Sequence, residues 1–158
     1  MQDKNNKSSF ILHSIYTKDI SFESPKTPQI FNLKLHPNLD FDLQTKINEI
    51  EKNVLYEVIL KISVIIYSVK QNENKNEAKM EKDETAFLIE IQQAGLFYIK
   101  GFSEQKKKII LATDCPSALF PYAREVISNI VIKGGFPQII LPPINFSMIN
   151  KLDNNKTV

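Results

Sequence analysis

Residues 120–146, FPYAREVISNIVIKGGFPQIILPPINF, contain the longest helical pattern of the chain. The expected helix begins near Asp114 and Pro116, a possible cap and a first-turn proline, and ends at Gly134 and Gly135. A helix that packs on one core needs a single apolar stripe, whereas this helix carries apolar residues on more than one face. They are Leu119, Phe120, Tyr122, Ala123, Val126, Ile127, Ile130 and Val131. Something besides the chain's own core is therefore expected to cover the second side.

Apolar stretches on the N-terminal side of this helix have the alternation of β-strands. In residues 10–23 the apolar side chains of Phe10, Leu12, Tyr16, Ile20 and Phe22 share one parity, and His13, Thr17, Asp19, Ser21 and Glu23 share the other. Residues 54–68 form a long strand pattern, and residues 85–101 another, with a bulge or bend expected at Gly95. The run KKKIILAT, residues 106–113, predicts a short fourth strand. Strands followed by a helix, without alternation of the two, predict an α+β fold with an antiparallel sheet.

The segments between these elements are expected to be irregular. Residues 24–46 contain Pro25, Pro28 and Pro37 without a sustained period and predict a long crossover. Residues 70–84 are polar throughout and predict a flexible hairpin loop, while residues 1–9 and 150–158 predict flexible tails. Residues 147–155, SMINKLDNN, predict a short helical turn. The 158 residues have the size of one domain, which we place at 1–158.

Composition excludes several classes of protein. A formal net charge of +2 provides no global field that would attract nucleic acid, so we expect none as a partner. The polar start, MQDKNNKSSF, lacks the apolar region of a secretion signal, and no run approaches the roughly 18 apolar residues of a membrane span. The single cysteine, Cys115, excludes an intramolecular disulfide framework. We therefore expect a cytoplasmic protein that does not insert into the membrane.

The sequence contains no catalytic motif that predicts an enzyme. The phosphate-loop, dinucleotide, nucleophile-elbow and zinc-protease patterns are absent, and the histidines and the cysteine have no metal-ligand spacing. We interpret His13 as a surface residue and Cys115 as a small buried hydrophobe rather than a reactive thiolate. A strand edge protected by lysine accounts for residues 106–108 at least as well as phosphate contact. We expect no enzymatic activity, no cofactor and no metal.

The feature that exceeds the background is apolar surface. One sheet covers one side of the long helix, and exposed apolar patches beyond a few hundred square ångströms are unusual in soluble monomers. A second subunit is the simplest cover, so the sequence predicts a homo-oligomer whose helices lie between sheets.

A recognisable pattern lies in four stretches: IYTKDISFESP (15–25), VLYEVILKISV (54–64), ETAFLIEIQQAGLFYIKG (84–101) and CPSALFPYAREVISNIVIKGGFPQIILPPINF (115–146). In this order they give the chain a resemblance to the SecB family of bacterial protein-export chaperones. It implies a four-stranded antiparallel Greek-key sheet with one long helix and a short C-terminal helix, assembled as a homotetramer that is a dimer of dimers. It also implies a chaperone that binds unfolded secretory precursor proteins in the cytosol and delivers them to the SecA motor.

The resemblance further implies sets of contact residues. An acidic SecA-binding patch falls on Asp19, Glu23, Leu88 and Glu90, although carboxylates on an exposed strand face are by themselves usually only solvated. Candidates for the client-binding groove are Leu35, Leu39, Phe41 and Leu43, and the alternative that they merely seal the core stays open. The oligomer interface is expected among Leu119, Tyr122, Val126, Ile127, Ile130 and Val131, divided between the chain's own sheet and neighbouring subunits.

The chain also departs from the family pattern. Family members are commonly acidic, whereas this chain is near neutral and has no Trp, with Leu35 where Trp is frequent. Residues 70–84 are longer than the usual connection, and the tail after Phe146 is short and not acidic. The alternative function is a SecB-like general or antitoxin-associated chaperone that is not dedicated to export. The complete acidic patch favours export.

Overall fold

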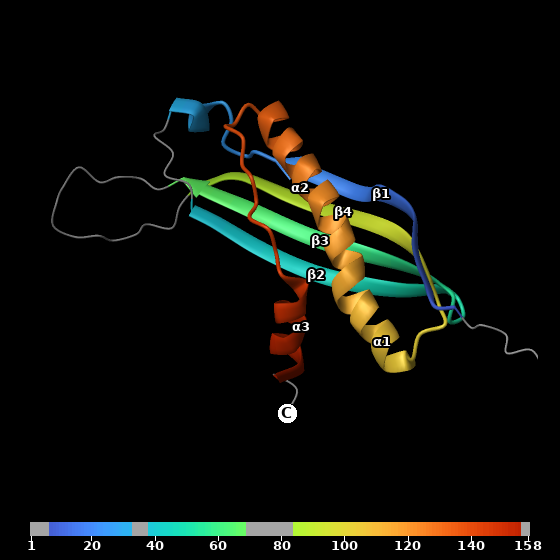
Figure 1. Ribbon diagram of the computed structural model, residues 1–158. Helices are drawn as coiled ribbons and strands as arrows, with labels where there is room; N and C mark the ends of the chain where they lie inside the picture. The colour runs from blue at the N-terminus through green and yellow to red at the C-terminus, as the bar shows by residue number, and fades with distance from the viewer. Residues whose placement is uncertain (1–6, 33–37, 69–83, 156–158) are drawn as a thin grey trace, which may run out of the picture.

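The computed structural model describes residues 7–32, 38–68 and 84–155 of the chain (Figure 1). Its antiparallel sheet contains β1 (Ser9–Glu23), β2 (Asn38–Glu51), β3 (Leu55–Ser68) and β4 (Glu84–Lys100), in the order β1-β4-β3-β2. Three consecutive neighbours and a fourth strand that lies beside the last of them form a Greek key. The predicted α+β class and four-stranded Greek-key sheet are confirmed.

Strand β2 is the main correction to the sequence prediction. Residues 38–46, expected within the irregular crossover, form most of β2. Leu39, Phe41 and Leu43 alternate with polar residues and pair with Ile66, Val64 and Ile62 of β3. This alternation has the period of two that marks a strand, although Pro25, Pro28 and Pro37 before it favour an irregular segment. Before β2, the crossover contains a short 3₁₀ helix, η1 (Gln29–Asn32).

The run at residues 106–113 is helical, which contradicts the predicted fourth strand there. Helix α1 (Glu104–Ile109) begins after Ser103, whose Oγ accepts a hydrogen bond from the backbone N–H of Lys106 at 3.3 Å. It continues through a π-helical turn, η2 (Ile110–Asp114), into α2 (Cys115–Lys133). The helix therefore begins ten residues before Asp114, the cap expected from the sequence, and Asp114 makes no side-chain capping bond.

The π-helical turn immediately precedes Pro116. A proline inside a helix cannot donate a backbone hydrogen bond and crowds the preceding turn. Here the N–H of Cys115 donates to the carbonyl of Ile110, five residues back, which widens the helix at that point. At its other end the helix stops at Gly134, as predicted.

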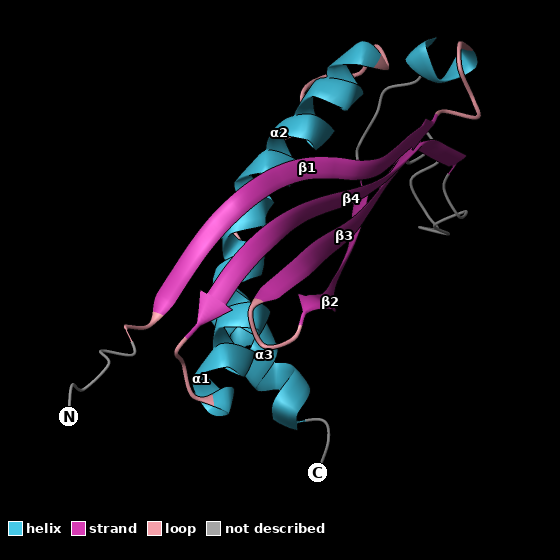
Figure 2. Cartoon of the chain, turned by 90° about the vertical axis from the view of Figure 1, so that its right-hand side faces the viewer, coloured by secondary structure: helices cyan, strands magenta, loops and turns pink. Residues whose placement is uncertain are grey.

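Helix α2 lies across one face of the sheet (Figures 1 and 2). We call the face toward α2 the helix side and the opposite one the helix-free face. The buried α2 residues Leu119, Ala123, Ile127 and Val131 form the core with the helix-side residues of β3 and β4. Gly95 forms no bulge, since it pairs regularly with Ile15 and Val58. A Cβ at this position would lie 2.8 Å from Cδ2 of Leu119, so glycine is required for the close approach of α2.

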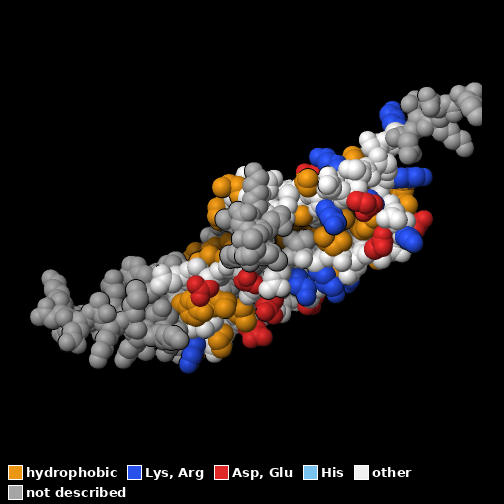
Figure 3. All heavy atoms as spheres, turned by 90° about the horizontal axis from the view of Figure 1, so that it is seen from below, with side chains coloured by type: hydrophobic (Ala, Val, Ile, Leu, Met, Phe, Trp, Pro, Cys, Tyr) orange, Lys and Arg blue, Asp and Glu red, His pale blue; other side chains and the backbone are white. Residues whose placement is uncertain are grey.

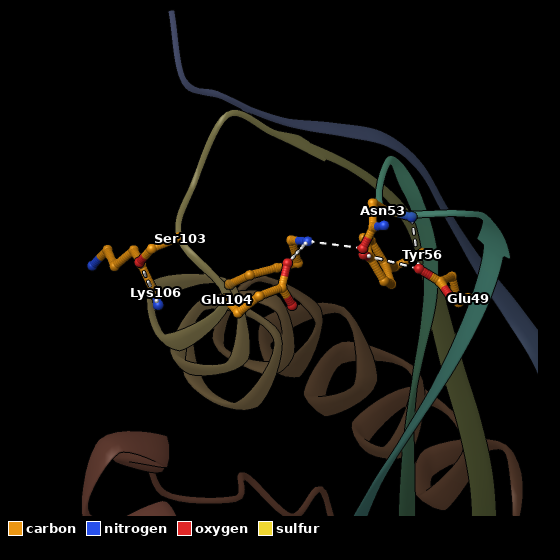
Figure 4. Close-up of polar contacts among 7 residues, drawn as sticks. Glu49, Asn53, Tyr56, Ser103, Glu104 and Lys106 are labelled. Atoms are coloured by element: carbon orange, nitrogen blue, oxygen red, sulfur yellow. Dashed lines mark hydrogen bonds and ion pairs between the residues drawn. The ribbon is translucent and has the colours of Figure 1, made fainter. Parts of the chain in front are cut away.

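A polar network attaches the start of the helix to the turn between β2 and β3 (Figure 4). Nζ of the buried Lys107 donates to Oε1 of Glu104 at 2.7 Å and to Oδ1 of Asn53 at 3.2 Å. The backbone N–H of Asn53, which has φ of 58°, donates in turn to Oε1 of Glu49 at 2.7 Å, and the Tyr56 hydroxyl donates to the same oxygen at 3.2 Å. Residues 106–108 therefore belong to a helix, and one of these lysines is committed to a structural role.

The C-terminal residues return to the helices. An extended segment after α2 leads to α3 (Phe146–Asn155), where Phe146 packs against Phe120 with ring centroids 6.0 Å apart. The predicted short C-terminal helix is confirmed, and it includes residues 150–155, which had been assigned to a flexible tail. The tail expected at residues 1–9 overlaps β1 only at Ser9. Residues 70–83 of the loop expected at 70–84 lie outside the described residues, and Glu84 is the first residue of β4.

Candidate partner-binding surfaces

The predicted SecA-contact residues lie together on the helix-free face of the sheet. Strands β1 and β4 are adjacent, and their register pairs Asp19 with Gln92, Ser21 with Glu90 and Glu23 with Leu88. The three carboxylates are exposed and Leu88 is half-buried. We call the set of Asp19, Glu23, Leu88 and Glu90 the acidic surface.

A shallow hollow extends the acidic surface toward β2. It has a volume of about 300 Å³ and is lined by Asp19 and Glu90 together with Asp42 of β2 and Lys61 of β3. Asp42 is not among the residues predicted from the sequence, because it lies in the segment that is expected to be irregular. Carboxylates outnumber the single lysine in this lining, so the hollow suits a basic group of a partner better than an acidic one.

A buried carboxylate lies on the same face. Oε1 of Glu57 accepts hydrogen bonds from the Tyr16 hydroxyl at 2.6 Å and from Nζ of Lys18 at 2.8 Å, while Oε2 accepts one from Nδ2 of Asn48 at 2.8 Å. These bonds, that from Lys18 above all, lower the pKa of Glu57 to about 2 despite its burial. Burial, followed by the bond to Glu57, raises the pKa of Tyr16 to about 12. We call these four residues the Glu57 cluster.

Tyr16 faces the side opposite to the one predicted. Extra residues in β1, between Leu12 and Ser14 and between Thr17 and Asp19, change the phase of the strand twice. Tyr16 therefore points to the helix-free face, and Thr17 donates to Oε1 of the buried Gln93 at 3.0 Å. Asp19 and Glu23 keep their predicted face, because two changes of phase cancel.

Three of the predicted client-groove residues lie on the helix side of β2. Leu39 is 44% exposed, Phe41 is 37% exposed and Leu43 is half-buried, whereas Leu35 lies outside the described residues. Leu43 also lines a hollow of about 450 Å³ between β2, η2 and α3, whose other apolar lining residues are Ile47, Ala112, Phe146 and Ile149. Figure 3, which shows the molecule from below, has hydrophobic side chains gathered among acidic and basic ones.

The predicted interface residues of α2 divide into two groups. Leu119, Ile127 and Val131 have no exposed surface and belong to the chain's own core, so a second copy has no access to them. Tyr122 is 52% exposed, and Val126 and Ile130 are partly buried. The residues available to another subunit are therefore these last three, joined by Ile132, which is 50% exposed and was not among the predicted residues.

The cysteine and the histidines are the residues that a catalytic or metal-binding site would use first. Cys115 is fully buried, as predicted, and burial raises the pKa of its thiol far above the usual range. His13 is exposed, also as predicted, and His36 lies outside the described residues. Among the described residues, no three His, Cys, Asp or Glu side chains are grouped as metal ligands would be. None of the described helices is long and apolar enough to cross a membrane.

Comparison with known proteins gives a consistent result. Residues 3–156 match the family model described as SecB, Preprotein translocase subunit SecB. A protein of Hydrogenovibrio crunogenus named protein-export protein SecB is 38% identical over 94% of this chain and 91% of its own length. Proteins of the same name from Methylococcus capsulatus and Legionella pneumophila (strain Corby) are 41% and 40% identical, over 89% and 92% of this chain and 81% and 82% of their own lengths.

A solved structure shares the fold. It is a Mycobacterium tuberculosis SecB-like chaperone in complex with a ChAD peptide from the HigA1 antitoxin. The TM-score is 0.65 at 13% identity, and the match covers 86% of this chain and 91% of the other.

Proposed function

The chain belongs to the SecB family of protein-export chaperones, and we propose that it binds unfolded precursor proteins in the cytoplasm and delivers them to the SecA motor. The observation that carries the delivery step is the acidic surface. Its four residues, predicted from separate parts of the sequence, lie on adjacent strands of one uncovered sheet face. Complementary charge speeds encounter and orients docking, which suits a basic segment of a partner.

For client binding we propose the groove beside β2. Leu39, Phe41 and Leu43 offer apolar contacts on β2, which is an edge strand of the sheet in the described part of the chain. The edge of such a strand offers backbone donors and acceptors to an extended chain. Backbone pairing and adaptable apolar contacts do not depend on one sequence, which a chaperone with many clients requires. Such holding of an unfolded chain needs no catalytic group.

For assembly we propose a homotetramer built as a dimer of dimers, with α2 between sheets. Tyr122 and Ile132 expose about half of their side chains on α2, and Val126 and Ile130 are only partly covered. Tyr122, Val126 and Ile130 are four residues apart and share one face of the helix, which is typical of an interface, whereas Ile132 points in another direction. Light scattering of the purified protein, with and without an unfolded precursor, tests this assembly. A monomer that ignores the precursor contradicts both the assembly and the client-binding proposal.

The delivery step is tested by calorimetric titration with SecA. Glu90→Lys reverses one charge of the acidic surface and is expected to weaken binding at least about tenfold at moderate salt, while the oligomeric state stays the same. Glu51→Lys makes the same charge change at the last residue of β2 and serves as the matched control. Equal affinity of wild-type protein and Glu90→Lys argues against this surface as the SecA contact.

The client groove is tested with a photo-crosslinking residue placed at Phe41. An unfolded precursor is expected to crosslink there, and not from Lys61, which is exposed on the opposite face of the sheet. If Phe41 and Lys61 give equal yields, the groove assignment fails.

A SecB-like chaperone that serves an antitoxin instead of export remains the second candidate, because the M. tuberculosis neighbour was solved with an antitoxin peptide. The two candidates differ in SecA binding. Retained binding of unfolded clients without any affinity for SecA favours the second candidate, whereas SecA binding that depends on Glu90 favours export.

A further inference from the structure

We propose that Glu57 is a positioning residue for the acidic surface. Through Tyr16 and Lys18 it holds β1 in a register, displaced by two residues along β4, that spaces Asp19 and Glu23 around Glu90. This proposal rests on the proposed function, since SecA is the partner that the spacing serves.

The displacement follows from the pairing of β1 with β4. Near the start of β1, Phe10 pairs with Ile99, and near its end Ser21 pairs with Glu90. If the pairing continued from Phe10 without the extra residues, Asp19 would lie opposite Glu90. Like charges directly opposite each other on neighbouring strands are destabilising. In the observed register Ser21 occupies that position, so the carboxylates of Asp19 and Glu23 lie on diagonals to Glu90.

The Glu57 cluster lies where the displacement arises. Tyr16, between the two extra residues of β1, pairs with Ala94, which is fully buried on the helix-free face. Such a small residue leaves room for the tyrosine to cross β4 and donate to Oε1 of Glu57 on β3. Lys18, the second extra residue, donates to the same oxygen. One carboxylate therefore holds both residues 14–17, whose phase is reversed between the two extra residues, and the bulge at Lys18 that ends this segment.

The alternation of apolar and polar residues does not by itself choose this register. Phe22 packs on Phe87 and Phe136, with ring centroids 5.7 and 6.4 Å apart, and this contact keeps Phe22 on the helix side and its neighbours on the other face. A slip of two residues leaves every side chain on its face, because the side-chain period of a strand is two. The contacts to Glu57 are specific to the register, as are the hydrogen bonds of Thr17 to Gln93 and of Ser24 to the carbonyl of Ala86, whereas the apolar pattern specifies only the face.

The chain offers a matched control for this proposal. Tyr16→Phe and Lys18→Met each remove a bond between β1 and Glu57, while Asn48→Ala removes a bond to the same carboxylate from β2. Lys18→Arg keeps the charge and the donor and is the rescue variant. Affinity for SecA is measured by calorimetry. The register is measured by methyl NOEs, because Ile20 pairs with Ile91 in the observed register and would pair with Ile89 after a slip of two residues.

We expect Tyr16→Phe and Lys18→Met to weaken SecA binding at least about threefold. This is less than the full free energy of one hydrogen bond to a charged group, because only part of that free energy is expected to affect SecA binding. The Ile20–Ile91 NOE is expected to weaken relative to Ile20–Ile89 in both variants, while Asn48→Ala and Lys18→Arg resemble wild-type protein in both measurements. Equal losses in Asn48→Ala and the β1 variants overturn the proposal, since they indicate general destabilisation. Wild-type affinity in the β1 variants overturns it too, provided that Glu90→Lys loses binding.

Failure of the proposed function can be distinguished from failure of the positioning role of Glu57. If wild-type protein itself does not bind SecA, delivery fails, and the NOEs still test the register separately. An unchanged Ile20–Ile91 NOE in both β1 variants then overturns the role of Glu57 in the register.

Discussion

Replacement of Glu57 by glutamine is expected to change how stability depends on pH. The pKa of this carboxyl falls from its ordinary 4.5 to about 2 in the folded protein. A group whose pKa is lowered by folding stabilises the folded state above its unfolded pKa, and that stabilisation is lost as the pH falls through the folded pKa. At 1.36 kcal/mol for each pH unit between these values, Glu57 contributes about 3 kcal/mol at pH 7 and about 1 kcal/mol at pH 3.

The difference between wild-type protein and Glu57→Gln isolates this contribution, because the other carboxylates are common to both. We expect the difference in free energy of unfolding to shrink by about 2 kcal/mol between pH 7 and pH 3. Urea unfolding followed by far-UV circular dichroism measures it, at one fixed subunit concentration because assembly also stabilises the fold. Glu51→Gln, at the exposed last residue of β2, is the control and should show a constant difference. Parallel pH profiles for wild-type protein and Glu57→Gln would refute the reasoning.

Further predictions follow from single contacts. Gly95→Ala should lower the free energy of unfolding by about 1–3 kcal/mol, measured by urea unfolding, because the added Cβ meets the side chain of Leu119 at 2.8 Å. Tyr122→Glu should shift the assembly toward smaller species in light scattering, whereas Tyr122→Phe, which keeps the apolar ring, should not; equal behaviour of the two variants removes Tyr122 from the interface. Cys115 should not react with a thiol reagent at pH 8 until the protein is unfolded, because the thiol is fully buried and its pKa is raised.

Much of the acidic surface was predictable from local patterns. Alternation in residues 10–23 and 85–101 placed Asp19, Glu23 and Glu90 on the outer faces of their strands, and the resemblance to SecB identified them as a set. The predicted face of Asp19 is correct, although the predicted phase of residues 14–17 is wrong. The two extra residues in β1 each reverse the phase, so that their effects on the face cancel. The Glu57 cluster was not predictable, since its members come from β1, β2 and β3 and meet only when those strands pair.

The strand expected at residues 106–113 shows the same limit of local patterns at the level of the fold. The run at 106–113 has a strand-like composition, but the Ser103 cap and the burial of Ile110 and Leu111 in the core favour a helix, and burial depends on what lies around the run. Leu39, Phe41 and Leu43 carried a strand period that the preceding prolines obscured. Sequence periodicity reports which residues share a face, because that depends only on the backbone geometry of one segment. Register, bulges and the partners of a buried carboxylate depend on several segments at once, and only the tertiary structure decides them.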